Sequence, residues 1–302
     1  MEEGHRCGLL RLGDGGYPPL LAEIGCPPAR LFVAGAPLEP APHVAVVGTR
    51  RPSRYGVEVA EWLASGLAEA GIVVVSGMAV GIDAAAHRGA LGAGGATVAV
   101  LGCGLDVRYP RANADLRRSI ESGGTLLSEY PPGTPPLAHH FPLRNRIIAG
   151  ISLGVVIVEG RANGGAMITA RLAAEFGREV FVVPGPVHAP GSGGPHALIR
   201  EGARLVTSAE DVLYDLGLLH APCSGRGSPE AAQLTPDERT LLAAIEAEPT
   251  LLDRIAQAAG MPASAAAATL SRLEMRGLVS RHPGGRFSLP VAPGPVAPGM
   301  RG

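Results

Sequence analysis

Lysine is absent from this chain of 302 residues, and all 26 basic side chains are therefore arginine. Walker-type phosphate loops, pyridoxal Schiff bases and the ATP-binding strand of protein kinases each need a lysine, so these three classes are excluded. Cysteine is almost as scarce, and Cys7, Cys26, Cys103 and Cys223 form no C-x-x-C pair. We therefore expect neither a zinc site nor a disulfide framework, and reduced thiols in a cytosol fit this pattern best.

Long apolar runs are also missing, since those present have the length of a strand and fall far short of a membrane span. The acidic start, Met1-Glu2-Glu3, lacks the basic region and apolar core of a secretory signal. We therefore expect a soluble, cytoplasmic protein. Its formal net charge is −1, so nucleic acid could bind only where positive charge is concentrated locally.

Apolar residues make up 46% of the chain and aromatic residues only 4%, which predicts a large core of Ala, Val, Leu and Ile. From residue 43 onward, apolar runs without alternation follow one another, separated by stretches of helical character. Such runs indicate strands buried on both faces, and their order predicts a Rossmann-like, doubly wound and mainly parallel α/β sheet. The expected strands are Val44–Val47, Ile72–Val75, Thr97–Leu101, Thr125–Leu127, Val155–Val158, Val180–Val183 and a weaker Ala203–Val206. The expected helices are Glu58–Ala70, Asp83–Leu91, Asn113–Ser122, Asn145–Ser152, Met167–Phe176 and Pro195–Glu201.

Composition divides the chain further. Residues 1–42 are predicted to be an N-terminal extension packed against the α/β domain of residues 43–217. Residues 218–234 have the composition of a linker, and residues 291–302 that of a disordered tail. In residues 235–290 three helices precede a hairpin, with Thr235 as N-cap and Pro236 in the first turn, which is the order of a winged helix.

Ligands of such sheets bind beyond the carboxyl ends of the strands. The first strand is followed by Gly48, Thr49, Arg50, Arg51 and Ser53. Arginines beside a helix start are typical of an anion site, and we favour contact with phosphate over a merely solvated basic loop.

The second strand is followed by Ser76, Gly77 and Gly81, which frame a tight turn into a helix, but their spacing is not that of a dinucleotide fingerprint. Asp83 could be a catalytic acid, although capping or orienting this loop is the better interpretation. For His87 a local hydrogen bond is favoured over catalysis.

The loop after the fourth strand is the most informative stretch. Phe141 precedes Arg144, Asn145 and Arg146 at a predicted helix start. An aromatic ring beside arginines can stack a base while the cations hold phosphates. The alternative is that Phe141 anchors the core and the arginines pair with Glu129 or Glu159.

After the fifth strand, Gly164 and Gly165 precede a helix with Thr169 in its expected first turn, which offers further amides to an anion. Cys103, after the third strand, resembles an elbow nucleophile. It lacks the G-x-S-x-G pattern and an assignable His–acid pair, so a small apolar filler is the better interpretation.

The ordered series GTRRPSRYG, SGMAVGIDAAAH, VAVLGCGLDVRYP, LLSEYPPGT, FPLRNRIIAG, ITARLA and FVVPGP resembles the DNA-processing protein A (DprA/Smf) family over about residues 17–215. The resemblance implies an electropositive pocket for single-stranded DNA, a homodimer, and delivery of DNA to the RecA recombinase in natural transformation. It implies a binding protein rather than an enzyme. Because the sequence holds neither a P-loop nor a cluster of metal ligands, we expect no cofactor or metal requirement. The pocket roles that carry over fall on Gly48, Thr49, Arg50, Ser76, Gly77, Gly81, Phe141, Arg144, Asn145 and Arg146. Supporting roles are expected for Asp83, His87, Glu129 and Glu159.

The chain departs from the family pattern at a few positions. Val80 stands where a polar or basic residue is frequent, and Gly164 and Ala166 replace serines. Ala138 lies near a position that is often lysine. His139 and His140 are the nearest substitutes for that lysine, so these departures suggest a pocket that depends more than usual on arginine and on pH.

Two other functions remain open. A nucleotide phosphoribohydrolase would need the glutamate of P-G-G-x-G-T-x-x-E, but the corresponding stretch ends Ile168-Thr169-Ala170-Arg171. A transcription regulator could read duplex DNA with the winged helix. Its six arginines are balanced by six acidic residues, however, and the Ala263–Thr269 helix face offers little to reach base edges.

Overall fold

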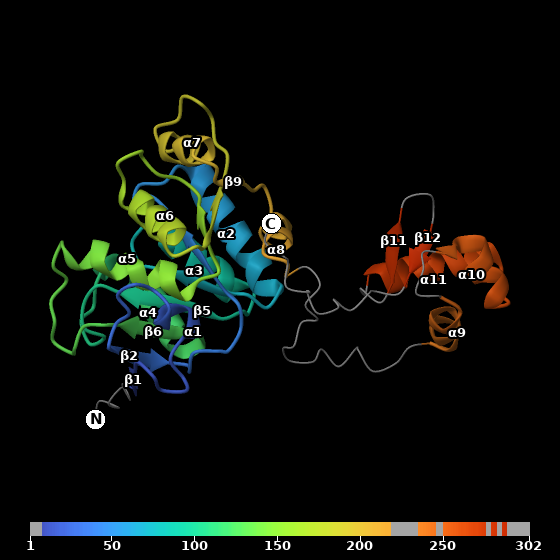
Figure 1. Cartoon of the computed structure of the whole chain (residues 1–302), viewed down its shortest axis with the longest axis horizontal. Helices are drawn as coiled ribbons and strands as arrows, with labels where there is room; N and C mark the ends of the chain where they lie inside the picture. The colour runs from blue at the N-terminus through green and yellow to red at the C-terminus, as the bar shows by residue number, and fades with distance from the viewer. Residues whose placement is uncertain (1–7, 219–234, 246–249, 276–278, 283–285, 289–302) are drawn as a thin grey trace, which may run out of the picture. The chain divides into compact units, whose positions relative to one another are not determined.

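The computed structural model describes residues 8–218, 235–245, 250–275, 279–282 and 286–288. The chain divides into two compact units, Met1–Cys223 and Ser224–Gly302, which are considered separately below (Figure 1). None of the described helices is long and apolar enough to cross a membrane.

The described part of the larger unit is built on a nine-stranded sheet of order β1-β2-β6-β5-β4-β3-β7-β8-β9. The strands are β1 (Gly8–Arg11), β2 (Arg30–Gly35), β3 (His43–Val47), β4 (Val73–Ser76), β5 (Thr97–Leu101), β6 (Thr125–Ser128), β7 (Gly154–Ile157), β8 (Glu179–Val182) and β9 (Arg204–Leu205). All neighbours from β6 across to β9 pair in parallel, which confirms the predicted mainly parallel sheet.

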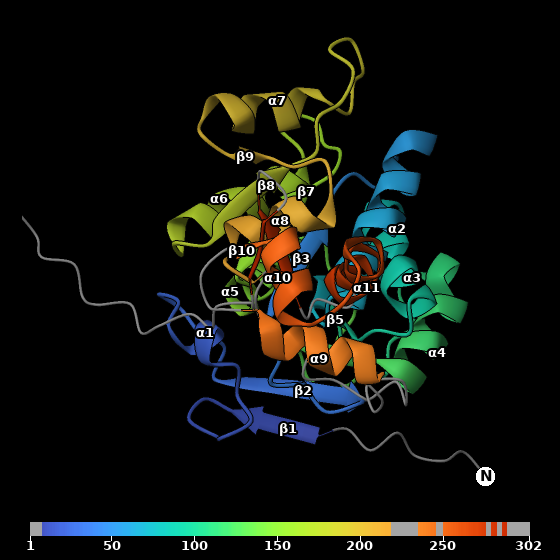
Figure 2. The same cartoon turned by 90° about the vertical axis from the view of Figure 1, so that its right-hand side faces the viewer.

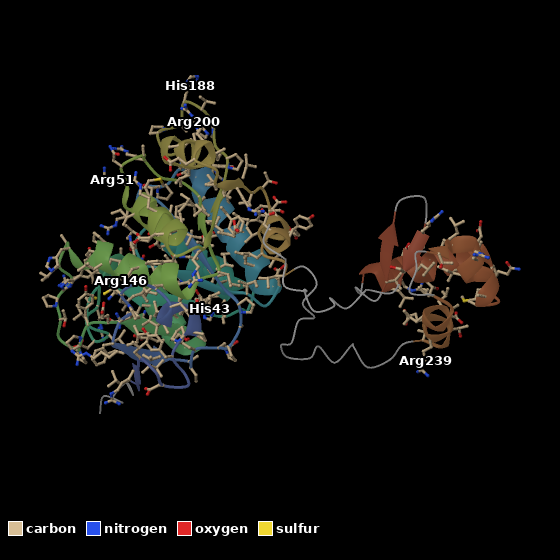
Figure 3. All side chains as sticks on the ribbon, viewed as in Figure 1. His43, Arg51, Arg146, His188, Arg200 and Arg239 are labelled. Atoms are coloured by element: carbon tan, nitrogen blue, oxygen red, sulfur yellow. The ribbon has the colours of Figure 1, made fainter. Side chains whose placement is uncertain are left out.

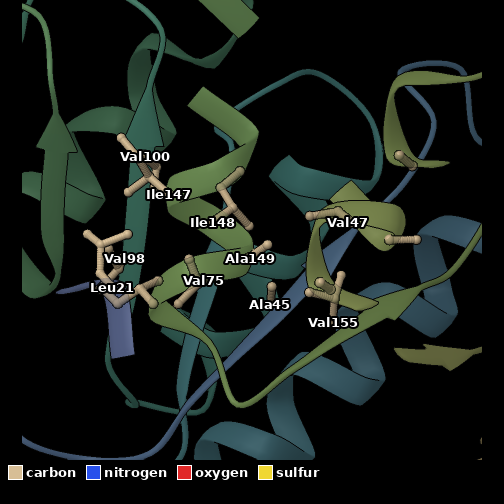
Figure 4. Close-up of a cluster of buried hydrophobic side chains, with 14 of the residues drawn as sticks. Leu21, Ala45, Val47, Val75, Val98, Val100, Ile147, Ile148, Ala149 and Val155 are labelled. Atoms are coloured by element: carbon tan, nitrogen blue, oxygen red, sulfur yellow. The ribbon is translucent and has the colours of Figure 1, made fainter. Parts of the chain in front are cut away.

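Helices cover both faces of this sheet (Figure 2). Alternate residues of each central strand face opposite sides, so Ala45 and Val47 pack with one helical layer while Val44 and Val46 pack with the other. The first layer contains α1 (Pro19–Ala22), α5 (His140–Ile151), α6 (Gly165–Glu175) and α7 (Gly193–Arg200). The second contains α2 (Arg54–Glu69), α3 (Ile82–Gly92), α4 (Ala114–Gly123) and α8 (Ala209–Asp215), with α4 preceded by a short 3-10 turn, Arg111–Asn113. Figure 4 shows part of the first core, where strand valines meet Ile147 and Ile148 of α5.

The order of the strands reverses between β3 and β7. The chain moves outward from β3 to β6, returns to the other side of β3 at β7, and continues to β9. Because the two following crossovers leave in opposite directions, the loops at the carboxyl ends of β3 and β7 diverge and leave a crevice.

The N-terminal segment, predicted to pack against the α/β domain, adds two strands to its sheet that were not predicted from the sequence. These are β1 and β2, and β2 pairs antiparallel with β6. The four-residue β1 has no fully buried side chain. Strands of this kind lack the uninterrupted apolar run from which the central strands were predicted. Helix α8 was not expected either.

Five of the six predicted helices begin earlier than predicted, α2 by four residues, and the shifts of α5 and α6 change the place of predicted site residues. Helix α5 starts at His140, so Arg144, Asn145 and Arg146 lie in its second turn rather than at its start. The added first turn contains Pro142, which is tolerated there because its missing N–H would have no helical partner. Helix α6 starts at Gly165, which places Thr169 beyond its first turn.

The smaller unit has the predicted winged-helix order. Helices α9 (Pro236–Ala244), α10 (Leu252–Ala258) and α11 (Ala263–Met275) precede β11 (Ser280–His282) and β12 (Arg286–Ser288). Thr235 caps α9 as expected, in a capping box with Glu238. A short strand missed by the prediction, β10 (Thr250–Leu251), pairs with β12. The predicted linker from residue 219 on and the tail at 291–302 lie outside the described residues.

Candidate nucleic-acid interface

A cavity of about 580 Å³ opens at the crevice between the carboxyl ends of β3 and β7. Loops that follow β3, β4, β5, β6 and β7 contribute to its wall, and side chains of the core form its floor. The predicted binding residues that line it are Gly48, Thr49, Arg50, Phe141, Arg144, Asn145, Gly164, Gly165 and Thr169. Ala138 and Ala166, two of the positions that depart from the family pattern, line it as well. As expected for loops that follow parallel strands, the fold therefore brings together residues that lie more than a hundred positions apart in sequence.

Glycines shape the β3 side of this cavity by allowing close backbone approach. A Cβ on Gly48 would lie 2.6 Å from Cγ1 of Ile82 and 2.8 Å from the carbonyl oxygen of Glu159. Gly81 has φ +91°, and a Cβ there would collide with the carbonyl oxygen of Thr49. Gly81 therefore positions the loop from behind, without lining the cavity itself.

The arginine that stands over the Phe141 ring is Arg50, whereas the sequence predicts Arg144 and Arg146 beside this ring. The guanidinium carbon of Arg50 lies 5.3 Å from the ring centroid of Phe141, within the range of a cation–π contact. The ring of Tyr109, from the loop after β5, lies 5.5 Å from that of Phe141. These three side chains form an aromatic, positively charged wall of the cavity.

Arg144 lies in the floor and is only 4% exposed. Its Nη1 donates hydrogen bonds to the carbonyl oxygens of Gly77, at 2.7 Å, and of Val100, which ties the ends of β4 and β5 together. Burial lowers the pKa of Arg144 to about 10, and the neighbouring Asp83 opposes this shift, so the guanidinium stays charged near neutral pH. Arg144 therefore acts first as a structural cation beneath the cavity.

Asp83 is the buried counter-charge of Arg144. Burial raises its pKa, while Arg144 and the backbone N–H groups of Ala79, Gly48 and Gly77 lower it. The carboxylate therefore accepts hydrogen bonds from the loops after both β3 and β4 and holds these two loops together. This agrees with the prediction that Asp83 orients the loop.

Arg146 does not line the cavity. Its Nη2 donates to Oε1 of Glu129 at 2.7 Å, and the pair lies near Tyr17 of the N-terminal segment. In Figure 3 Arg146 and Arg51 lie well apart on the larger unit. For Arg146 the structure thus favours the ion pair with Glu129 over a place beside Arg50 and Arg144.

The N-terminus of α2 also differs from the predicted phosphate site. The Glu159 carboxylate accepts a hydrogen bond from the backbone N–H of Ser53 at 2.9 Å and another from its hydroxyl. Ser53 Oγ in turn accepts from the N–H of Gly56, as an N-cap. An internal carboxylate therefore occupies the position at which an external anion was expected.

Ser76 is satisfied within the fold, whereas His87 has a hydrogen-bond partner at Nδ1 and none at its buried Nε2 among the described residues. The Ser76 hydroxyl donates to the carbonyl oxygen of Val46 at 2.7 Å, in the sheet itself. His87 Nδ1 lies 2.7 Å from Oγ1 of Thr97, which donates to the Val74 carbonyl oxygen, so Nδ1 carries the proton. Burial lowers the pKa of His87 to about 3, and the contact with Thr97 is a local hydrogen bond of the kind that was favoured over catalysis.

Cys103 is 1% exposed and packs with Leu101 and Leu105, as an apolar filler would. Burial raises the pKa of its thiol, which disfavours a nucleophilic thiolate. The interpretation as filler is confirmed.

The carboxyl edge of the sheet carries several arginines whose charge is not neutralised. Within the described residues, none of their guanidinium groups is in an ion pair; they are Arg50, Arg51, Arg108, Arg111 and Arg161. Sequence reasoning missed Arg108, Arg111 and Arg161 as site residues, although each follows a strand end and could have been found by the same rule.

The acidic side chains of this edge are engaged internally. The Asp106 carboxylate accepts from the backbone N–H of Gly133 at 2.8 Å and 2.9 Å. Glu129 holds Arg146, and Glu159 holds Ser53. The edge is therefore locally basic although the whole chain has a net charge of −1.

The described part of the winged-helix unit offers few cationic side chains for contact with a DNA duplex. Arg272 of α11 donates to Oγ1 of Thr269, and its Nε lies 3.9 Å from the carboxylate of Glu238. The one α11 arginine with a described side chain is thus turned toward its own unit, which disfavours the transcription-regulator alternative.

Comparison with known proteins bears on the same architecture. The family described as "DNA recombination-mediator protein A" matches residues 8–217, and the family described as "DprA winged helix domain" matches residues 227–285. This chain belongs to the DprA family. The resemblance found in the sequence motifs is confirmed, and so is the combination of a Rossmann-like sheet with a winged helix.

Named relatives include Protein Smf of Escherichia coli, 43% identical over 286 residues that span 90% of this chain and 75% of that protein. The DNA processing protein DprA of Streptococcus pneumoniae is 50% identical over 203 residues, 67% of this chain and 72% of that one.

Two solved DprA structures are similar as well. The X-ray structure of the S. pneumoniae protein matches with a TM-score of 0.67 and 47% identity over 70% of this chain and 74% of that one. The DprA of Helicobacter pylori, whose structure is described as revealing a unique single-stranded DNA binding mode, has a TM-score of 0.63 and 29% identity. That match covers 72% of this chain and 98% of the H. pylori chain.

Proposed function

We propose that this DprA family member binds single-stranded DNA along the carboxyl edge of its large sheet, with the cavity between β3 and β7 as the centre of the interface. The observation that carries the proposal is the local charge. Arg50 and Arg161 line the cavity, and neither arginine forms an ion pair with any of the described residues. Arginines of this kind replace condensed counterions on a phosphate backbone, which makes binding favourable and dependent on salt.

The aromatic wall favours an unpaired strand over a duplex. Phe141 and Tyr109 stand beside Arg50, so a base can stack on a ring while the arginine contacts the adjacent phosphate. Stacking of this kind needs a base that is free to leave its neighbours, as in a single strand. The described binding mode of the H. pylori relative supports the same class of ligand.

The site supports binding without catalysis. Among the described residues that line the cavity, Asp83 supplies the one carboxylate, and this group already holds Arg144 and backbone amides. A phosphoribohydrolase needs a carboxylate that can reach the substrate and transfer a proton. Incubation with nucleoside monophosphates should therefore release no free base.

In the cell, a protein of this kind protects an incoming strand and loads a RecA recombinase on it during natural transformation, acting in the cytoplasm as a homodimer. The family membership supports this role, and the basic edge supplies its first step. The edge offers backbone contacts, which position a strand of any sequence, and this suits a protein that must accept any incoming DNA.

The proposal is tested by fluorescence anisotropy with labelled oligonucleotides. A single strand should bind at least roughly tenfold more tightly than a duplex of the same length at the same salt concentration. A RecA filament should then form faster on DNA coated with single-stranded-DNA-binding protein when this protein is added. Equal affinity for both DNA forms would overturn the proposed ligand, and an unchanged rate of filament formation would overturn the loading role.

A further inference from the structure

The cavity has the character of a pocket for one small ligand as well as that of a groove. Its floor consists of side chains from the core, among them Val47 and Ile148, which are 4% and 1% exposed. A floor of this kind closes the cavity from below, so a strand passing over the edge cannot run through it. The volume of about 580 Å³ lies within the range of roughly 300–1,000 Å³ that is usual for pockets that enclose small molecules.

One end of the cavity has backbone N–H groups that can bind a phosphate. The N-terminus of α6, an eleven-residue helix, opens on it with Gly164 as N-cap and Gly165 and Ala166 in the first turn. The N–H groups of a first turn have no helical acceptor and carry the positive end of the helix dipole. Unlike α2, whose N-terminus holds Glu159, α6 has no carboxylate among the described residues that line its start.

Thr169 supplies a second, independent sign of a ligand at this end. Its side chain lines the cavity although the residue is only 2% exposed, and its hydroxyl oxygen is not among the enclosed atoms of the described residues, so it opens on the cavity. Because helical side chains lean toward the N-terminus, a residue four positions after Gly165 lies over that first turn. A hydroxyl that opens on the cavity without a protein partner is free to donate a hydrogen bond to a phosphate oxygen held by the amides of Gly165 and Ala166.

The other end of the cavity has aromatic rings on which a base can stack. Tyr109 follows β5 and Phe141 begins α5, whereas α6 follows β7, on the other side of β3. The aromatic rings and the phosphate-binding amides therefore lie on opposite sides of the β3 loop that carries Arg50. A nucleotide presents the same sequence of groups, with a planar base at one end and a phosphate at the other.

We propose that the cavity is a site for a single nucleoside 5′-monophosphate, which binds as a free ligand and competes with single-stranded DNA. The phosphate lies on the first turn of α6 and on the Thr169 hydroxyl, and the base lies against Phe141 and Tyr109. The inference rests on the proposed function, since it assigns one nucleotide unit of the strand to the cavity. A phosphomonoester can come from a free nucleotide or from the 5′ end of a strand, and the test separates the two.

Isothermal titration calorimetry on the full chain measures binding of dAMP and dTMP, with deoxyadenosine, ribose 5-phosphate and inorganic phosphate as partial ligands. Both nucleotides should bind with dissociation constants of about 1 mM or below, and each partial ligand at least roughly tenfold more weakly. Absence of nucleotide binding at about 10 mM, or equal binding of inorganic phosphate, would overturn the proposal.

Two variants of Thr169 isolate the hydroxyl. Thr169→Val keeps the shape of the side chain and should weaken nucleotide binding roughly tenfold, the usual effect of losing one hydrogen bond to a charged group. Thr169→Ser keeps the hydroxyl and should bind within about threefold of the parent chain. Equal affinities in the two variants would contradict the assignment.

A third variant guards against an effect on folding. A Cβ on Gly165 meets no atom within 4 Å, so Gly165→Val leaves the packing intact while it crowds the first turn of α6. It should abolish nucleotide binding with no loss of thermal stability, and retained binding would contradict the phosphate position.

Competition with DNA completes the test. The free nucleotide should displace a 5′-hydroxyl oligothymidylate, and a 5′-phosphorylated oligonucleotide should bind more tightly than its 5′-hydroxyl form if the strand end enters the site. Equal affinity of the two oligonucleotides assigns the site to free nucleotides. Strand binding without nucleotide binding defeats this inference alone, whereas failure of the strand itself to bind defeats the proposed function.

Discussion

Nη2 of Arg146 lies 2.7 Å from Oε1 of Glu129, in an ion pair whose side chains are 17% and 28% exposed. The neighbouring motif arginine, Arg144, is buried in the cavity floor, whereas Arg50 remains exposed at the rim. Arginines that look alike in the sequence thus have different structural positions, and this makes their contributions separable by mutation.

Arg146→Ala should destabilise the fold without weakening DNA binding. Removal of the guanidinium leaves Glu129 partly buried and unpaired, which costs about 1–3 kcal/mol of the free energy of unfolding. Urea unfolding measures that loss, and anisotropy should show strand affinity within about twofold of the parent chain. If Arg146→Ala and Arg50→Ala weakened strand binding equally, the ion pair would not be the main role of Arg146.

Arg144→Ala should be the more damaging change, because it removes the hydrogen bonds to Gly77 and Val100 and leaves Asp83 as a buried, unpaired carboxylate. Loss of one partner of a buried pair costs about 3–5 kcal/mol. The double variant Asp83→Asn/Arg144→Gln should recover part of this loss. A double-mutant cycle of unfolding free energies measures the coupling, and simple additivity of the two single changes would rule out the pairing.

Phe141→Leu should weaken strand binding through loss of base stacking, by about 1–3 kcal/mol for each stacked base. Phe141→Tyr keeps the ring and should restore most of the affinity. Since Phe141 carries no charge, the salt dependence of binding should stay the same in both variants. A reduced salt dependence in Phe141→Leu would show that the variant had displaced Arg50 rather than removed a stack.

Two histidines whose Nε2 atoms are buried without a partner in the described part of the chain should make the fold sensitive to acid. Burial lowers the pKa of His43 to about 4 and of His87 to about 3, whereas both ionise at about 6.5 in an unfolded chain. Between these values the unfolded chain binds more protons, so stability is full above about pH 6.5 and falls as the pH drops toward 4.

Each of these histidines should lower the free energy of unfolding at pH 5 by about 2 kcal/mol, compared with its value at neutral pH. Urea unfolding at pH 7.5 and at pH 5 measures the loss, and His43→Leu should reduce it by about half. An equal loss with and without His43 would contradict the assignment.

The parallel sheet was predictable because each central strand is buried on both faces and therefore reads as an uninterrupted apolar run. β1 and β2 escaped prediction because pairing with β6 depends on tertiary contact, and β1 buries no side chain fully. The missed first turn of α5 contains Pro142, whose missing N–H has no consequence there.

The location of the site followed from the rule about strand ends, but the role of each side chain did not. Glu129 and Glu159 stand at strand ends just as the arginines do, and only the folded chain shows that they engage Arg146 and Ser53. Pairing between residues far apart in sequence decides which charges remain for a ligand, and a local pattern does not contain it.

The salt dependence of strand affinity tests the central claim most directly. For an oligothymidylate, a plot of log affinity against log salt should be less steep by about 0.7 for each lost phosphate contact, so by about 1.4 in Arg50→Ala/Arg161→Ala. Arg88→Ala, which removes an exposed arginine on the flank of α3, is the matched control and should leave the slope unchanged. An unaltered slope in the double variant, or an equal change in the Arg88 variant, would contradict a strand held by the carboxyl edge.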